Sequence, residues 1–167
     1  MKTAGKVLLI FLFTVLCVWN WTYPGYCKEK TRKEHYPDGK LKAVYPENDG
    51  GLLDGVVKKY YQSGKLQGEE TYMNNFKEGT SKWYYENGKL KEAVNYKSGK
   101  RDGIGKAYYE SGKVQAEVNF KDGKQDGRAK AYYESGKVMQ EENYKDGNLI
   151  SHTCYDEKGN PIECPKQ

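Results

Sequence analysis

Histidine, the residue that most often performs acid–base catalysis, is scarce in this chain. The 167-residue sequence holds two histidines, His35 and His152, which lie in opposite flanks. No Ser-His-Asp or Cys-His set can be assembled around either of them. Cys154 and Cys164 have only His152 nearby, which is not a zinc-binding spacing, so we expect no metal and no cofactor. The sequence therefore predicts a protein that is not an enzyme.

The residues best suited to binding are tyrosines and lysines that recur every 24 residues. The first tyrosines of four Tyr-Tyr pairs are Tyr60, Tyr84, Tyr108 and Tyr132, and lysines in the same phase are Lys58, Lys82, Lys106 and Lys130. On one face of a sheet they would form an aromatic and cationic strip for a protein chain, a glycan or a lipid headgroup. The alternative is structural: the same residues hold neighbouring repeats together.

Turn signals occur at two places in each 24-residue unit. The first ends in a glycine, at Gly64, Gly88, Gly112 and Gly136. Asn87-Gly88 is typical of a two-residue type I′ turn, in which Glu86 faces Lys89 and Tyr85 faces Leu90. Residues that alternate between apolar and polar follow, up to a second turn at Ser98-Gly99. Each unit is therefore predicted to be a β-hairpin.

Because 24 is an even number, the alternation keeps its phase between units. We predict an all-β fold in which tandem hairpins form an elongated, twisted, single-layer antiparallel sheet over residues 35–153. Tyr61 and its equivalents would lie on the apolar face, and Lys58, Tyr60 and their equivalents on the other. Residues 154–167 would form a capping hairpin, with Cys154 and Cys164 facing each other around Gly159. They would form a disulfide or remain as two free thiols.

The units YYENGKLKEAVNYKSGKRDG (residues 84–103) and YYESGKVQAEVNFKDGKQDG (residues 108–127) resemble the variant MORN repeat (membrane occupation and recognition nexus). In bacteria this variant is grouped as the YwqK-type antitoxin family, and the resemblance spans about Tyr36–Tyr155. It implies a row of β-hairpins in a curved single sheet. It also implies a role as an antitoxin, or as an interaction or membrane-associated scaffold.

The N-terminal segment predicts export. Lys2 and Lys6 precede a 13-residue apolar run, Val7–Trp19, which fits a secretory signal and is shorter than the ~20 residues of a spanning helix. We predict that residues 1–27 are a signal peptide or membrane anchor and residues 28–34 a linker. The protein would then be periplasmic, otherwise exported, or membrane-anchored. A buried cytosolic helix is the alternative.

Composition narrows the classes of partner. The chain has 28 Lys+Arg and 23 Asp+Glu, interspersed along its length, which argues against a nucleic-acid partner. Only 37% of residues are hydrophobic, too few for one central core, while 16 tyrosines argue against disorder. The resemblance and the predicted export together imply an exported or membrane-tethered scaffold that presents its Tyr/Lys-rich face to a protein, either a toxin or an envelope protein. Neutralising a cognate toxin, or associating with a membrane surface, are the alternative functions.

Overall fold

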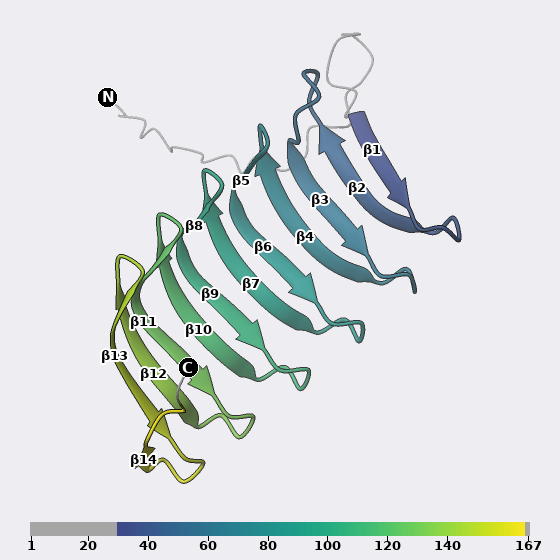
Figure 1. Ribbon diagram of the computed structural model, residues 1–167. Helices are drawn as coiled ribbons and strands as arrows, with labels where there is room; N and C mark the ends of the chain where they lie inside the picture. Colours follow the sequence, from purple (N-terminus) through teal and green to yellow (C-terminus); the bar gives the residue numbers. More distant parts are fainter. Residues whose placement is uncertain (1–29, 166–167) are drawn as a thin grey trace, which may run out of the picture.

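The computed structural model describes residues 30–165, and every regular element in this range is a β-strand (Figure 1). The fourteen strands are β1 (Lys30–His35), β2 (Leu41–Glu47), β3 (Gly55–Tyr60), β4 (Leu66–Met73), β5 (Phe76–Lys77), β6 (Gly79–Tyr84), β7 (Leu90–Lys97), β8 (Lys100–Arg101), β9 (Gly103–Tyr108), β10 (Val114–Lys121), β11 (Lys124–Tyr132), β12 (Val138–Lys145), β13 (Asn148–Tyr155) and β14 (Pro161–Ile162). They form one antiparallel sheet that follows chain order, with β5 and β8 as short extensions pairing with β4 and β7. The predicted all-β hairpin array is confirmed.

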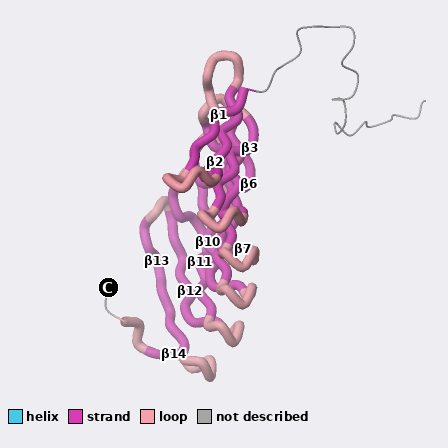
Figure 2. The backbone as a smooth tube through the Cα atoms, turned by 90° about the vertical axis from the view of Figure 1, so that its right-hand side faces the viewer, coloured by secondary structure: helices cyan, strands magenta, loops and turns pink. Residues whose placement is uncertain are grey.

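The sheet is a single layer, which Figure 2 shows nearly edge-on. Among the described residues no second layer covers it, so side chains are buried only by their neighbours on the same face. Buried apolar side chains, among them Val57, Val94 and Ala129, lie on the face predicted to be apolar, which we call the core face. The opposite surface, which carries Lys58, Lys82, Lys106 and Lys130, is called the ladder face.

The first turn of each hairpin differs from the prediction of a two-residue type I′ turn. The Gly88 N–H donates to the Tyr85 carbonyl at 2.8 Å, and the Tyr85 N–H donates to the Lys89 carbonyl at 2.8 Å. The loop therefore has three residues, and only Gly88 has a positive φ, 85°. This geometry is a type I turn followed by a left-handed glycine. Gly64, Gly112 and Gly136 occupy the same position, with φ of 86°, 94° and 90°.

The longer turn shifts the strand register by one residue next to it. Tyr84, and not Tyr85, lies opposite Leu90, so that detail of the prediction was wrong. The next pair is Trp83 with Glu92, because a β-bulge places an extra residue on β7. The bulge cancels the shift, and the predicted register holds from Trp83 onward.

The expected pairing of glutamate and lysine across the first turn was also wrong. The Nζ of Lys89 instead donates to the Ser111 carbonyl at 3.1 Å, in the next repeat. Lys113 and Lys137 reach the carbonyls of Glu134 and Glu157 in the same way, both at 2.8 Å. The longer loop carries these lysines past their own hairpin, so they link adjacent repeats.

The second turns are the ones with type I′ geometry. Ser98 and Gly99 both have positive φ, 48° and 80°. The equivalent pairs are Asn74-Asn75, Asp122-Gly123 and Asp146-Gly147. Each of these turns also contacts the preceding repeat through its backbone, as when the Gly123 N–H donates to the Arg101 carbonyl at 2.8 Å. Both rows of turns therefore connect hairpins as well as close them.

The ends of the array differ from the predicted boundaries. Residues 30–34, expected to be part of a linker, belong to β1, which pairs with β2 from Lys30 onward. At the other end β14 pairs only with Cys154 and Tyr155 of β13. The proposed leader, residues 1–27, lies outside the described residues. Within residues 30–165 no helix is long and apolar enough to cross a membrane.

Candidate binding faces

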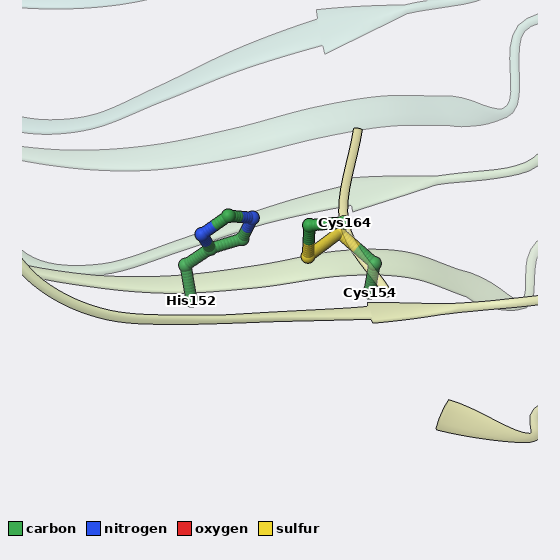
Figure 3. Close-up of side chains that lie close together, drawn as sticks. All are labelled: His152, Cys154 and Cys164. Carbon is green, nitrogen blue, oxygen red and sulfur yellow. A yellow bond between two sulfur atoms is a disulfide. The ribbon is translucent and has the colours of Figure 1, made fainter. Parts of the chain in front are cut away.

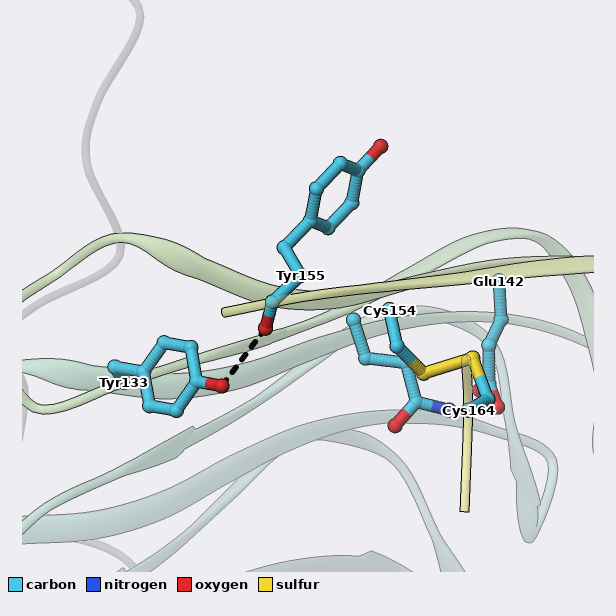
Figure 4. Close-up of a disulfide and its surroundings, with 6 residues drawn as sticks. Tyr133, Glu142, Cys154, Tyr155 and Cys164 are labelled. Atoms are coloured by element: carbon cyan, nitrogen blue, oxygen red, sulfur yellow. Dashed lines mark hydrogen bonds between the residues drawn. A yellow bond between two sulfur atoms is a disulfide. The ribbon is translucent and has the colours of Figure 1, made fainter. Parts of the chain in front are cut away.

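The second tyrosine of each pair connects one repeat to the next. The Tyr109 hydroxyl donates to the Tyr132 carbonyl at 2.6 Å, and the bond is partly buried. The same bond joins Tyr36 to Tyr60, Tyr61 to Tyr84, Tyr85 to Tyr108, and Tyr133 to Tyr155, at 2.6–2.7 Å. Figure 4 shows the bond from Tyr133 to Tyr155. These tyrosines have a structural role, which is one of the two roles that the sequence left open for tyrosines.

The lysines of the ladder face are mostly paired with glutamates. Lys106 lies opposite Glu117, and their Nζ and Oε1 atoms are 2.6 Å apart. Lys130 and Glu141 are also 2.6 Å apart, and Lys58 and Glu69 are 3.7 Å apart. The predicted strip of cations is thus largely neutralised by carboxylates in neighbouring strands. The sequence analysis did not identify these glutamates as partners, although they occupy one slot of the 24-residue period.

The first tyrosines of the pairs add to this ladder. The Tyr132 hydroxyl donates to Glu117 Oε2 at 3.3 Å, and Tyr84 donates to Glu69 at the same distance. The hydrogen bond from Lys106 is the main cause that holds the pKa of Glu117 below its usual value. Burial raises the pKa of Tyr132, and the charge of Glu117 adds to this effect. Lysine, glutamate and tyrosine thus form one repeating three-residue unit.

One repeat lacks the glutamate of this unit. Ala93 occupies its slot, with Lys82 on one side and Lys106 on the other. Among the described residues, Lys82 has no ion pair and the Tyr108 hydroxyl has no hydrogen-bond partner. The side chain of Lys82 is exposed to solvent. We call Ala93 with Lys82 and Tyr108 the ladder gap.

The core face carries a buried ion pair at the N-terminal end of the array. Glu70 is 2% exposed, and its carboxylate contacts the Nζ of Lys59 at 2.8 Å and that of Lys77. Burial alone would raise the pKa of Glu70, but the two lysines outweigh it and lower the pKa. The Nζ of Lys59 lies 4.8 Å from the centroid of the Trp83 ring. The indole is so close to Gly68 that a Cβ there would be 2.7 Å from it.

The middle of the core face is hollowed because its residues are small. A depression of about 260 Å³ lies over Gly105, Ala107 and Ala116. Its charged lining residues are Glu92, Arg101 and Lys106, and the Nζ of Lys106 is paired with Glu117. The lining contains no histidine, cysteine or serine. The Arg101 guanidinium lies 5.2 Å from the centroid of the Phe120 ring. The hollow therefore offers a concave shape, with Glu92 and Arg101 as oppositely charged residues in its lining, for binding.

Cysteine and histidine side chains come together at the C-terminal end. A disulfide joins Cys154 and Cys164, whose Cα atoms are 5.3 Å apart. In the β13–β14 ladder Cys154 lies opposite Ile162, so the two cysteines are not the facing pair that the sequence suggested. His152 lies beside the disulfide (Figure 3). Its proximity could not be inferred from the spacing of the residues.

Comparison with known proteins identifies the repeat. The MORN repeat variant family matches four consecutive segments, residues 53–74, 77–98, 101–122 and 125–146, which together make up just over half of the chain. The match does not extend to the YwqK-type antitoxin family in particular. A comparison with curated proteins found no match. The repeated hairpins, their period and the sequence match together show that this chain belongs to the MORN repeat variant family.

Proposed function

We propose that this protein is a non-enzymatic binding scaffold whose ladder face docks an acidic segment of a protein partner at the ladder gap. The observation that carries the proposal is the absence of one carboxylate from an otherwise regular row. Glu117 accepts hydrogen bonds from Lys106 and from Tyr132. By the same repeat geometry, a carboxylate at the gap would accept from Lys82 and Tyr108. An aspartate or glutamate of a partner would supply that missing group.

The gap is also suited to recognition because its surroundings are already ordered. Lys106 and Tyr84 on either side are engaged with Glu117 and Glu69. A partner carboxylate at the ladder gap therefore meets two donors, Lys82 and Tyr108, with no carboxylate of this chain competing for them. Elsewhere on this face the lysines Lys58, Lys106 and Lys130 already have partners. Among the four matched repeats the gap therefore occurs in one, while before them Val44 of β2 occupies the same slot, between Lys33 and Lys58.

The test restores the missing carboxylate. In the full chain, Ala93→Glu should reproduce the Lys-Glu-Tyr unit and occupy the gap, while Ala93→Gln supplies a side chain of the same size without charge. Random peptides displayed on phage are selected on the wild-type chain, and the affinity of the selected peptides is then measured for all three chains. We expect peptides enriched in Asp and Glu whose binding falls at least tenfold with Ala93→Glu and less with Ala93→Gln. Equal binding to all three, or no acidic enrichment, would contradict the proposal.

The identity of the natural partner decides between the finer roles. Wild-type and Ala93→Glu chains used as baits should differ in one retained protein, which the wild-type chain binds and the variant does not. If that protein is a toxin, the scaffold is an antitoxin. Binding to anionic vesicles that weakens steeply with salt, and that Ala93→Glu leaves unchanged, would replace the protein partner by a lipid surface.

We also propose that the array acts outside the cytosol, with residues 1–27 as a cleaved signal or a retained anchor. The Cys154–Cys164 disulfide supports this location, because such bonds persist in oxidising compartments. Cell fractionation, together with the mass of the mature N-terminus, is the measurement. A cytosolic protein that keeps its leader would contradict this part of the proposal.

A further inference from the structure

The last full strand brings three metal-binding side chains together. Donor atoms of His152, Cys154 and Cys164 all lie within 4.8 Å of one another (Figure 3). His152 and Cys154 are two residues apart on β13 and therefore lie on the same face of the sheet. The turn that leads into β14 returns the chain so that Cys164 reaches them. A hairpin, and not a close sequence spacing, assembles this cluster.

We propose that reduction of the Cys154–Cys164 disulfide converts this cluster into a zinc site, independently of the proposed binding function. A dithiol reductant transfers two electrons and two protons to the disulfide, which gives two thiols, and the reductant becomes a disulfide. Zn²⁺ then binds both sulfurs as thiolates and releases two protons. The His152 imidazole supplies the third ligand. In the oxidised chain both sulfurs are committed to each other, so the site exists only after reduction.

The dimensions of the cluster suit this metal. Zn–S bonds of about 2.3 Å and Zn–N bonds of about 2.0–2.1 Å place the donors of a tetrahedral site roughly 3.3–3.8 Å apart. The three donor atoms already lie within 4.8 Å, so small movements are sufficient. Cys164 follows the end of β14 at Ile162 and has no ladder partner, so its sulfur can separate from that of Cys154. Cys154, which is 5% exposed, would form the buried side of the site.

Glu142 is the residue best placed to complete the coordination. It lies opposite His152 in the β12–β13 register, and Figure 4 draws it beside the disulfide. Its carboxylate now accepts hydrogen bonds from Gln140 at 2.6 Å and from Tyr144 at 3.0 Å. These bonds hold the carboxylate at this end of the core face. It would serve as the fourth ligand directly, or orient a water in that position.

The experiment uses the full chain with Cys17 and Cys27 replaced by serine, so that only two thiols can form. The chain is prepared oxidised or reduced under anaerobic conditions and titrated with Co²⁺, whose thiolate charge-transfer band reports sulfur ligation. Zn²⁺ is then added to displace it. We expect one metal per reduced chain and none per oxidised chain. Cys164→Ser should abolish the band.

Further variants test the remaining ligands. His152→Ala should lower the affinity at least tenfold, and His152→Cys should restore it, which also shows that the site folds. His35→Ala removes the other histidine and should change nothing. Glu142→Gln should weaken binding by about tenfold or more. Equal binding by oxidised and reduced chains, no binding by the reduced chain, or an unchanged affinity in His152→Ala would each overturn the proposal.

Discussion

The two rows of turns, at opposite ends of the strands, join the repeats by different chemistry. At the row of first turns, which we call the tyrosine edge, the hydroxyl of Tyr109 donates to the Tyr132 carbonyl in a partly buried bond. At the row of second turns, the carboxylate edge, Asp126 accepts from the Asp146 N–H at 3.1 Å in a bond exposed to solvent. Glu78 and Asp102 make the equivalent bonds to Ser98 and Asp122, at 2.8 and 3.3 Å.

The difference teaches how a single-layer sheet is held together without a central core. Water and salt compete for the exposed carboxylate acceptors and weaken their bonds. The partly buried bonds between a tyrosine hydroxyl and a carbonyl are less accessible to water and carry no net charge that salt could screen. The tyrosine edge should therefore contribute more to the coupling between repeats. The carboxylate edge should respond more to pH and salt.

The largest expected effect comes from removing the hydroxyls of the tyrosine edge. Tyr85→Phe, Tyr109→Phe and Tyr133→Phe together leave three carbonyls without their donors and should lower the free energy of unfolding by about 3 kcal/mol, or about 1 kcal/mol each. Urea denaturation measures the loss. The matched control is Glu78→Gln, Asp102→Asn and Asp126→Asn, which should cost less. Equal losses of unfolding free energy in the two triple variants would contradict the stronger contribution expected of the tyrosine edge.

An intermediate effect is expected from acid at the carboxylate edge. Hydrogen bonds from the Asp146 backbone and from Lys145 lower the pKa of Asp126 below its usual 3.8. The unfolded chain then binds a proton more readily than the folded chain, so this carboxylate stabilises the fold above about pH 3.8 and ceases to do so as pH falls through its folded pKa.

The measurement compares melting temperatures of the wild-type and Asp126→Asn chains between pH 7 and pH 2.5. Their difference should be constant near neutral pH and should shrink at the acid end. The difference between wild type and Tyr109→Phe involves no carboxylate and should stay constant. A Tyr109→Phe difference that also shrinks would show that the two edges do not separate in this way.

The smallest expected effect concerns turn geometry. Ser98 has a φ of 48°, which asparagine tolerates better than serine, so Ser98→Asn should stabilise the chain by less than about 1 kcal/mol. Ser111 precedes the glycine of a first turn and is not among the residues with positive φ. Ser111→Asn should therefore leave the unfolding free energy nearly unchanged. A similar gain at both serines would contradict the assignment of the two turn types.

Much of the architecture could be predicted because the same local pattern of turns and alternating side chains occurs in each of the four repeats. The alternation around Val94, and the even period, place the core face and the strand order. The turn type was missed because Asn87-Gly88 is compatible with both a two-residue and a three-residue loop. The compensating bulge, whose extra residue is Lys91 on β7, was also missed, because it is an adjustment between two strands and leaves no mark in the sequence of one strand alone.

The candidate sites show the same division. Lys106 and Glu117 fall opposite each other in the predicted register, so their pairing was available from the sequence, and so was the exception at Ala93. The bond from Tyr109 to the Tyr132 carbonyl could not be predicted from the sequence, because its acceptor is a backbone carbonyl, which every residue has. The closeness of His152 to the disulfide depends on the path of the turn before β14.

The sequence by itself determined the repeat, its hairpins and the faces of its strands, because an even period and alternating side chains act along the chain. Only the tertiary structure decided which donors meet which acceptors between repeats. Those contacts depend on twist, bulges and the length of each side chain, which act between strands and not along one strand. The Tyr109–Tyr132 bond and the cluster at Cys154 belong to this second group, whereas the lysine–glutamate pairing and the ladder gap follow from the strand register.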